Sequence, residues 1–365
     1  MPTNGMGVIS RKAGEPALLE EIIVDDPGPG EVLVRIQASG VCHTDLHYKL
    51  GRINNEFPFL LGHEGSGIVE AVGEGVTEPS VGDYVVLAWR APCGYCRFCA
   101  LGQPNLCSAS LNAQPRMTAK RDGAVLNPAL GIGTFCTHTV VAARQAVPVP
   151  TACPPEQASL LGCGVTTGIG AVLYTAGVRR GGTVAVYGCG GIGSSVIMGA
   201  KLARASRIIG VDIAENKLAW AKEFGATDVV NAADTDPVEA IKELTGGNGV
   251  DYSFECVGMP QTLLQALWSR DLAGTCVLIG VPDPTMVVDV PMLQFFGLGG
   301  SLRVSWYGDN LPSRDFPLFA NYYLSGELDL DRVVSAVIGL EDTESAFGAM
   351  ERGETLRSVI RIPDA

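Results

Sequence analysis

The chain has 365 residues, of which 47% are hydrophobic and 18% are charged, and its formal net charge at pH 7 is −13. The composition is that of a globular protein, and the length favours two domains over a single compact core. The negative charge argues against nucleic acid or an anionic membrane as a partner, so we expect a small-molecule substrate.

The first 150 residues predict an irregular β-rich domain, in which short apolar runs are separated by turn sequences such as DDPGPGE and VGD. The expected strands are EVLVRIQASG (31–40), GSGIVEAVG (65–73), DYVVLAW (83–89) and a run within THTVVAARQAVPVP (137–150). The N-terminal residues show no apolar run behind a basic start, so we expect no secretory signal and a cytoplasmic location. The uncharged stretch 158–178 is long enough for a membrane span, but its glycines and threonines favour buried core instead.

From Gly181 the pattern changes, because apolar strands alternate with segments of helical periodicity. The expected strands are TVAVYG (183–188), RIIGVD (207–212), DVVN (228–231), VDYSFECVG (250–258), GTCVLIGV (274–281) and, as a possible sixth, SLRVSWYG (301–308). This alternation predicts right-handed crossovers and a parallel sheet with helices on both faces. We therefore expect an α/β protein with domains at 1–164 and 165–304, and with 305–365 rejoining the first domain.

A glycine motif follows the first of these strands. Gly188, Gly190 and Gly193 form Gly-x-Gly-x-x-Gly before a helical stretch, and Asp212 ends the next strand 19 residues later. The first glycine permits a tight turn, the second lets the backbone approach a pyrophosphate, and the third lets helix pack on strand. An acid at 212 suits the adenosine ribose and would repel a 2′-phosphate, which favours NAD over NADP. The alternative is a similar turn that holds no cofactor, and Cys189 is expected to be a packing residue of the turn.

The 11 cysteines are better tested as metal ligands than as disulfides in a chain without an export signal. Cys93, Cys96, Cys99 and Cys107 form Cys-x2-Cys-x2-Cys-x7-Cys. Four closely spaced thiolates can close a tetrahedral zinc site with no open position, which would be structural. An iron–sulfur cluster is the alternative.

A second group of metal-binding residues is dispersed along the chain. Cys42, His63 and Cys163 could supply the three ligands of a catalytic zinc if the fold brings them together. Their spacing does not show this, and each of them taken singly is more often a core residue.

The sequence resembles the zinc-dependent medium-chain alcohol dehydrogenase family over nearly its full length. The matching features are Gly62, His63, Glu64, Gly67, Gly73 and Val76 of the zinc signature, the four-cysteine loop, and GCGVTTG (162–168) before the glycine motif. The resemblance implies a catalytic domain of GroES-like topology and a Rossmann domain, with two zinc ions and NAD per chain. It also implies a homodimer, with a tetramer as the alternative, paired through residues 277–292 and 301–306.

The resemblance also implies residue roles. Cys42, His63 and Cys163 match the ligands of the catalytic zinc, and a set of two cysteines and one histidine is the one known for alcohol dehydrogenase. Around the metal, the resemblance implies that Asp45 orients the ligating histidine and that Glu64 lies behind the metal, while Thr44 and His47 relay the substrate proton. For the cofactor, it implies that His43 and Arg357 contact the pyrophosphate, that Thr167 contacts the cofactor, and that Lys217 joins Asp212 on the ribose. Trp89 is expected in the substrate pocket or, alternatively, in the core.

Within the family, the sequence is most similar to the mycothiol-dependent formaldehyde dehydrogenase and S-nitrosomycothiol reductase branch, on the segments 51–64, 126–135 and 305–317. This implies S-hydroxymethyl-mycothiol as the substrate and a thiol site shaped by the loop 108–130. The basic residues Arg116, Lys120 and Arg121 of that loop are either part of it or solvated charges. The alternatives are a primary aryl or aliphatic alcohol dehydrogenase that needs no thiol, and a zinc- and NAD-binding sensor without turnover.

Overall fold

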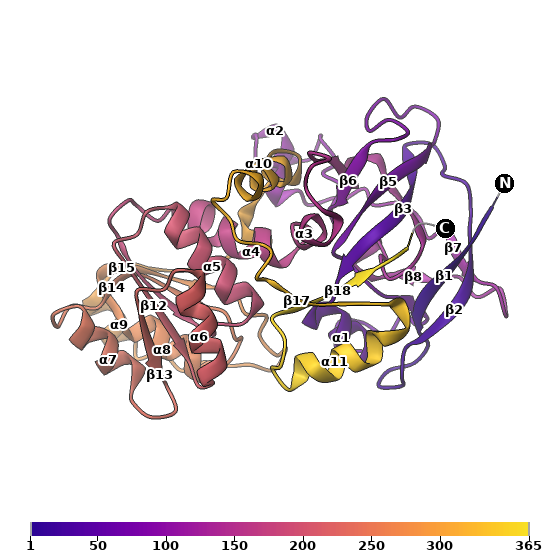
Figure 1. Ribbon diagram of the computed structural model, residues 1–365. Helices are drawn as coiled ribbons and strands as arrows, with labels where there is room; N and C mark the ends of the chain where they lie inside the picture. Colours follow the sequence, from indigo (N-terminus) through magenta and orange to yellow (C-terminus); the bar gives the residue numbers. More distant parts are fainter. Residues whose placement is uncertain (1, 364–365) are drawn as a thin grey trace. The chain divides into compact units, whose positions relative to one another are not determined.

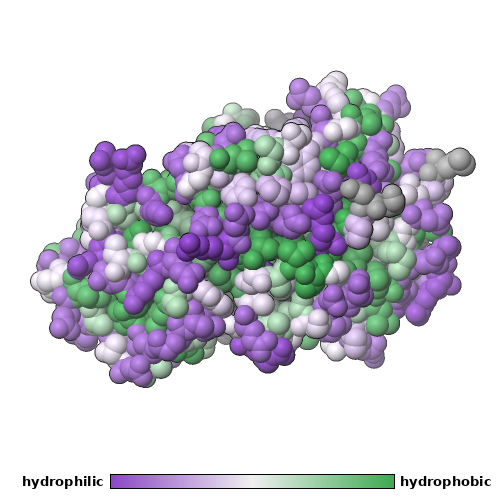
Figure 2. Space-filling view, in the orientation of Figure 1, coloured by the Kyte–Doolittle hydropathy of each residue, from purple (hydrophilic) through white to green (hydrophobic). Residues whose placement is uncertain are grey.

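The computed structural model describes residues 2–363, which divide into two compact units. Unit 1 contains the described residues up to Cys163 and those from Leu311 onward, and unit 2 is Gly164–Asn310. Hydrophilic side chains are spread over most of the face shown in Figure 2, with hydrophobic groups between them.

Unit 1 is built on two sheets, which appear in indigo and purple with the yellow C-terminal strands in Figure 1. The first has the strand order β7-β2-β1-β4-β8, and its strands are β1 (Thr3–Ser10), β2 (Leu18–Val24), β4 (Phe59–Leu60), β7 (Met117–Ala119) and β8 (Asn127–Pro128). The second has the order β10-β6-β5-β3-β18-β17 with β9 also on β3, and its strands are β3 (Glu31–Gly40), β5 (Gly65–Val72), β6 (Tyr84–Leu87), β9 (His138–Ala142), β10 (Ala146–Pro148), β17 (Val334–Ile338) and β18 (Arg357–Arg361).

Strand β3 is the centre of the second sheet and is buried along most of its length. It pairs antiparallel with β5, β9 and β18, so the last strand of the chain completes the sheet that the first hundred residues begin. The core beneath these sheets includes Val34, Ile36, Leu60 and Phe135. The helices of unit 1 are α1 (His43–Lys49), α2 (Arg97–Ala100), α3 (Pro155–Leu160), α10 (Pro312–Leu324) and α11 (Thr343–Glu351), with short 3₁₀ turns η1 (Pro104–Leu106), η2 (Ala129–Gly131), η3 (Ala143–Gln145) and η6 (Leu340–Asp342).

Unit 2 has one parallel sheet with the strand order β13-β12-β11-β14-β15-β16. Its strands are β11 (Thr183–Tyr187), β12 (Arg207–Asp212), β13 (Asp228–Asn231), β14 (Val250–Glu255), β15 (Arg270–Leu278) and β16 (Ser301–Val304). Its helices are α4 (Gly164–Gly170), the π-helical η4 (Ala171–Ala176), α5 (Gly191–Leu202), α6 (Glu215–Phe224), α7 (Pro237–Leu244), α8 (Pro260–Trp268), α9 (Met292–Leu298) and the turn η5 (Tyr307–Asp309).

The strand order reverses direction between β11 and β14, which makes this pair the switch point of a doubly wound sheet. Helix α5 contacts α6, and α7 contacts α8, as expected when right-handed crossovers place the two pairs on opposite faces. The predicted parallel sheet, including its sixth strand, is therefore confirmed. The crevice outside the carboxyl ends of β11 and β14 is where such sheets bind ligands.

The uncharged stretch 158–178 is divided among α3, α4 and η4, which are all shorter than a bilayer requires. Among the described residues, no helix is both long and apolar enough to span a membrane.

Candidate metal and cofactor sites

Cys42 lies at the N-cap of helix α1, and the first turn of this helix is organised by Asp45. One carboxylate oxygen of Asp45 accepts the backbone N–H of Cys42 at 3.1 Å. The other oxygen accepts the backbone N–H of Gly62 at 3.0 Å and lies 2.9 Å from Nδ1 of His63. Asp45 has no exposed surface, so this single buried carboxylate links the start of α1 to the segment before β5. With Nδ1 donating to Asp45, Nε2 of His63 is left with its lone pair.

The structure brings Cys42, His63, Glu64 and Cys163 together in unit 1. Their sulfur, nitrogen and oxygen ligand atoms all lie within 4.8 Å of one another. His63 Nε2 is buried and has no hydrogen-bond partner among the described residues. Two thiols and an imidazole are the donors that zinc prefers, and an orphaned lone pair on Nε2 suits a metal ion. These residues therefore fit a zinc ion, as expected from the resemblance.

The two thiols of this cluster differ, because the thiolate is favoured at Cys42, whereas the hydrogen bond to Cys42, together with burial, raises the pKa of Cys163. A hydrogen bond from Cys163 lowers the pKa of Cys42 well below its usual value, and Arg357 and His63 add to this effect against the opposing effect of burial. Burial lowers the pKa of His63, but Asp45 and Cys42 outweigh it and hold this pKa above its usual value, so a metal ion that binds Nε2 must displace a proton. A thiolate at Cys42 is the form that binds a metal.

Glu64 and Arg357 form a buried pair beside the cluster. The Nη2 atom of Arg357 lies 3.3 Å from Oε1 of Glu64, and Nη1 donates to the carbonyl oxygen of Val41 at 3.1 Å. Burial raises the pKa of Glu64 to about 7, although Arg357 opposes this shift. Arg357, which was expected on the cofactor pyrophosphate, thus has its guanidinium group engaged next to the metal cluster.

The remaining polar residues of α1 differ in exposure. His43 is exposed, whereas Thr44 and His47 are half-buried. Burial, together with the charge of Arg52, lowers the pKa of His47. A neutral imidazole at this position can accept a proton near pH 7.

Trp89 lies just after β6 and packs against the hydrophobic core of unit 1. Its carbonyl oxygen accepts a hydrogen bond from the side-chain amide of Asn112 at 3.1 Å. The side chain is partly buried, so its contacts agree with the core alternative, and its role in a substrate pocket stays a prediction.

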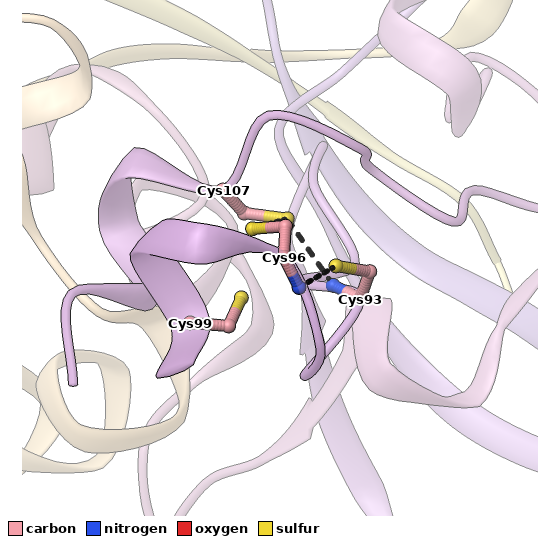
Figure 3. A group of neighbouring side chains, drawn as sticks. All are labelled: Cys93, Cys96, Cys99 and Cys107. Carbon is pink, nitrogen blue, oxygen red and sulfur yellow. Dashed lines mark hydrogen bonds between the residues drawn. The ribbon is translucent and has the colours of Figure 1, made fainter. Parts of the chain in front are cut away.

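The four-cysteine loop is compact (Figure 3). Cys96 immediately precedes α2, Cys99 lies within α2, and Cys107 immediately follows η1. The four sulfur atoms lie within 4.8 Å of one another. The backbone N–H of Cys93 donates to the sulfur of Cys107 at 3.2 Å, and that of Cys96 donates to the sulfur of Cys93 at 3.3 Å. Backbone hydrogen bonds lower the pKa of Cys96 to about 5. Four convergent sulfurs, all free of disulfides, form the closed donor set of a structural zinc site.

The glycine motif lies at the switch point of unit 2. Gly188 has φ +89°, a conformation that L side chains rarely adopt. A Cβ atom on Gly193 would lie 1.8 Å from the carbonyl oxygen of Gly188, so only glycine allows α5 to approach the end of β11 this closely. A Cβ atom on Gly190, in contrast, would meet nothing within 4 Å and would occupy open space.

Asp212 supports this turn from the neighbouring strand. Its Oδ2 accepts the backbone N–H of Cys189 at 2.8 Å, and its Oδ1 accepts those of Ile213 and Ala214 at 2.8 and 3.1 Å. Cys189 is fully buried within the turn, as expected of a packing residue. Lys217 lies half-buried in the first turn of α6, and Thr167 is buried in α4.

The basic residues of the loop 108–130 are paired with acidic residues of unit 1. Arg116 binds Glu31 at 2.8 Å, Lys120 binds Glu21 at 3.3 Å, and Arg121 lies 3.8 Å from Glu20. These pairs favour the alternative that the three cations are surface charges of the loop.

Comparison with known proteins agrees with this geometry. Residues 28–151 match the alcohol dehydrogenase GroES-like domain family, and residues 191–322 match the zinc-binding dehydrogenase family. An alcohol dehydrogenase zinc-binding domain protein from Burkholderia ambifaria is 34% identical with a TM-score of 0.95, and the match covers 100% of both chains. Benzyl alcohol dehydrogenase from Acinetobacter calcoaceticus is 32% identical with a TM-score of 0.92, over 99% of this chain and 100% of that one.

A third similar structure is a zinc-binding dehydrogenase from Sinorhizobium meliloti 1021 bound to NADP, which is 25% identical with a TM-score of 0.84 over 99% of this chain and 100% of that chain. This chain has full-length relatives and combines two groups of metal-ligating side chains, a GroES-like domain and a parallel-sheet domain with a glycine motif. The chain belongs to the zinc-binding medium-chain alcohol dehydrogenase family, and it is an enzyme of the alcohol dehydrogenase type.

Proposed function

We propose that this enzyme oxidises a primary alcohol group by hydride transfer to NAD. The observation that carries the proposal is the convergence of Cys42, His63 and Cys163, with Glu64 beside them, on one buried point of unit 1. A zinc ion bound there supplies a Lewis acid that polarises the substrate hydroxyl and lowers its pKa.

The protein's own residues then have separate tasks. Asp45 accepts the Nδ1 proton of His63 and so fixes the ring with Nε2 directed at the metal position. Arg357 holds one oxygen of Glu64 and neutralises part of its charge. Thr44 accepts the alcohol proton, and His47 passes it to solvent, because the lowered pKa of His47 keeps the imidazole neutral near pH 7.

The dinucleotide occupies the carboxyl ends of the strands of unit 2. The open space over Gly190 admits the pyrophosphate, and the N-terminus of α5 provides N–H donors toward it. Asp212 binds the adenosine ribose and disfavours a 2′-phosphate, so NAD is preferred over NADP. The further cofactor contacts that we propose are His43, Thr167 and Lys217, because the guanidinium group of Arg357 is engaged by Glu64 and Val41.

Two substrate classes remain, and different observations support them. The likeness to benzyl alcohol dehydrogenase over the full chain favours a primary aryl alcohol, for which Trp89 would form one wall of the pocket. The resemblance in the segments 51–64, 126–135 and 305–317 favours S-hydroxymethyl-mycothiol as the substrate. In this case the enzyme would also reduce S-nitrosomycothiol with NADH. The ion pairs of Arg116, Lys120 and Arg121 weaken the second case, because these cations are already matched by carboxylates.

One assay separates the two classes. NADH formation is measured with benzyl alcohol, ethanol and formaldehyde, each with and without mycothiol. Oxidation of benzyl alcohol without thiol supports the aryl alcohol, and formaldehyde oxidation only with mycothiol supports the adduct. Binding of zinc and NAD with no NADH formed from any of these mixtures would contradict both.

We also propose that the chain forms a homodimer through the edge strand β16. This strand ends the sheet of unit 2, and its Val304 is 64% exposed. On the preceding helix α9, Leu293 is 86% and Phe296 is 82% exposed. An unpaired strand edge next to exposed apolar side chains suits a second copy of the same chain. Light scattering should show a dimer that Val304→Lys weakens, whereas Val81→Lys, at an exposed position in unit 1, should leave it unchanged.

A further inference from the structure

Glu255 is a buried carboxylate at the carboxyl end of β14 that no part of the proposed chemistry uses. Its side chain has no exposed surface, and within the described residues 2–363 no lysine or arginine pairs with it. Its Oε1 accepts the backbone N–H groups of Val257 and Gly258 at 2.9 and 2.8 Å and the hydroxyl of Thr262 at 2.7 Å. Its Oε2 lies 3.0 Å from the same Gly258 nitrogen.

A buried carboxylate without a cation is costly unless hydrogen bonds replace its lost hydration. Here those bonds come from the loop that follows the strand and from the first turn of α8. The carboxylate therefore determines the path of residues 256–259, because two consecutive backbone N–H groups must point back at it.

This loop lies against the glycine motif. Strand β14 pairs with β11 so that Glu255 lies opposite Tyr187, and the backbone N–H of Cys256 donates to the carbonyl of Tyr187 at 2.9 Å. A Cβ atom on Gly188 would lie 2.6 Å from a methyl carbon of Val257. The loop that Glu255 holds thus forms the wall of the turn on the β14 side, while Asp212 holds Cys189 on the β12 side.

The residues that follow β15 pack against the same loop on its other side. A Cβ atom on Gly280 would lie 2.2 Å from the backbone nitrogen of Gly258 and 2.8 Å from Oε2 of Glu255. The loop is therefore packed between Gly280 and the glycine motif, at the switch point where a dinucleotide binds.

We infer that Glu255 is a positioning residue for the dinucleotide, because its carboxylate fixes the loop 256–259 against the glycine motif before the cofactor binds. The inference rests on the proposed binding of NAD by unit 2. Glu255 does not touch the cofactor. Its carboxylate restricts the conformations of the loop 256–259, which borders the cofactor, so cofactor binding does not have to order this loop.

The main test replaces the carboxylate with its amide. In Glu255→Gln, one oxygen keeps its acceptor role, but the amide NH2 must face a backbone N–H of the loop, so at least one charge-assisted hydrogen bond is lost. Titration of NADH by fluorescence should give a Kd about tenfold higher than that of the parent. Glu239→Gln, a surface glutamate of the same unit that pairs with Lys242, should leave Kd unchanged.

Two further variants keep the inference testable if Glu255→Gln fails to fold. Thr262→Val removes one donor without changing charge and should raise the NADH Kd about threefold, and Thr262→Ser, which keeps the hydroxyl, should restore it. In the cofactor-free protein, hydrogen exchange at the amides of Val257 and Gly258 should become faster in Glu255→Gln and Thr262→Val.

A purely structural role gives a different result. Glu255 also lies near the N-terminus of α8, where a negative charge stabilises a helix. If that were its only role, the folded fraction would fall while the Kd of the folded protein for NADH stayed within about twofold of the parent, and the inference would be wrong. If the parent itself binds neither NADH nor NADPH, the proposed function fails and the inference with it; a parent that binds NADH beside variants that bind equally well overturns the inference alone.

Discussion

Replacement of Asp45 by Asn tests how the protein prepares His63 for a metal. The carboxylate accepts hydrogen bonds from Cys42, Gly62 and His63 at 2.9 to 3.1 Å. An asparagine has one acceptor oxygen; if this stays on Gly62 and His63, its NH2 group must face the backbone N–H of Cys42. One hydrogen bond to a charged group is then lost, worth about 1.5–3 kcal/mol. Since tenfold in affinity corresponds to about 1.4 kcal/mol, zinc at this cluster should bind about 10–100-fold more weakly.

The assay is competition for zinc with a chromogenic chelator, read as two separate release steps. Zinc held by the four-cysteine loop is an internal control, because Asp45 touches none of its cysteines. Asp122→Asn, an exposed residue of the same unit that pairs with Arg11, is the matched control variant and should release both zinc ions as the parent does. The reasoning would be refuted if the cluster of Cys42, His63 and Cys163 in Asp45→Asn bound zinc with an affinity within about threefold of the parent's.

Three more predictions concern separate parts of the site. In the parent, the lowered pKa of His47 keeps its imidazole neutral, and this neutral form accepts the proton. His47→Ala should therefore slow alcohol oxidation about tenfold near pH 7 and approach the parent rate at high pH, where hydroxide takes the proton. A pH–rate profile like the parent's would contradict the relay. Asp212→Asn, which keeps an acceptor for the backbone N–H of Cys189, should shift the NAD to NADP ratio of kcat/KM about tenfold toward NADP, and an unchanged ratio would count against the assignment. Cys99→Ser should lower the zinc content from two ions per chain to about one and reduce the unfolding temperature while the Cys42 cluster keeps its metal; elemental analysis showing two ions would exclude a structural zinc held by the four-cysteine loop.

The parts of the site that are local in the sequence could be predicted from it. The glycine motif, the strand before it and the helix after it are contiguous, and the four cysteines lie within 15 residues, so spacing alone indicates their chemistry. The central strands of unit 2 were also predictable, because burial on both faces makes a strand such as β11 (TVAVY) almost continuously apolar.

The dispersed cluster could not be obtained from spacing, because it depends on strand register. Cys42 follows β3 and His63 precedes β5, and these strands pair antiparallel with Ser39 opposite Gly65. The two residues therefore lie at the same end of adjacent strands, a relation that only the register fixes. Cys163 joins them through α3, which packs on both strands. At the level of the sequence, only the family resemblance joined these three residues.

Glu255 was missed for the same reason. Its importance follows from the pairing of β14 with β11, whose partners Tyr187 and Glu255 are far apart in the sequence. An acid at the last position of β14, beside the strand that leads into the glycine motif, is the signal that could have identified it. Asp212 was found because it has a known distance from the motif, whereas Glu255 has none.

Two glycines of the motif should respond in opposite ways to the same change. In Gly193→Ala, the new Cβ would lie 1.8 Å from the carbonyl oxygen of Gly188, so α5 must move and the cofactor-free protein should lose about 1–3 kcal/mol of unfolding free energy. In Gly190→Ala, nothing lies within 4 Å of the new Cβ, so the free protein should keep its stability while the methyl group obstructs the pyrophosphate and weakens NADH binding. Thermal unfolding without cofactor and NADH titration separate the two effects. If Gly190→Ala bound NADH as tightly as the parent, the cofactor would not approach the motif over Gly190, and the proposed position of the pyrophosphate would be wrong.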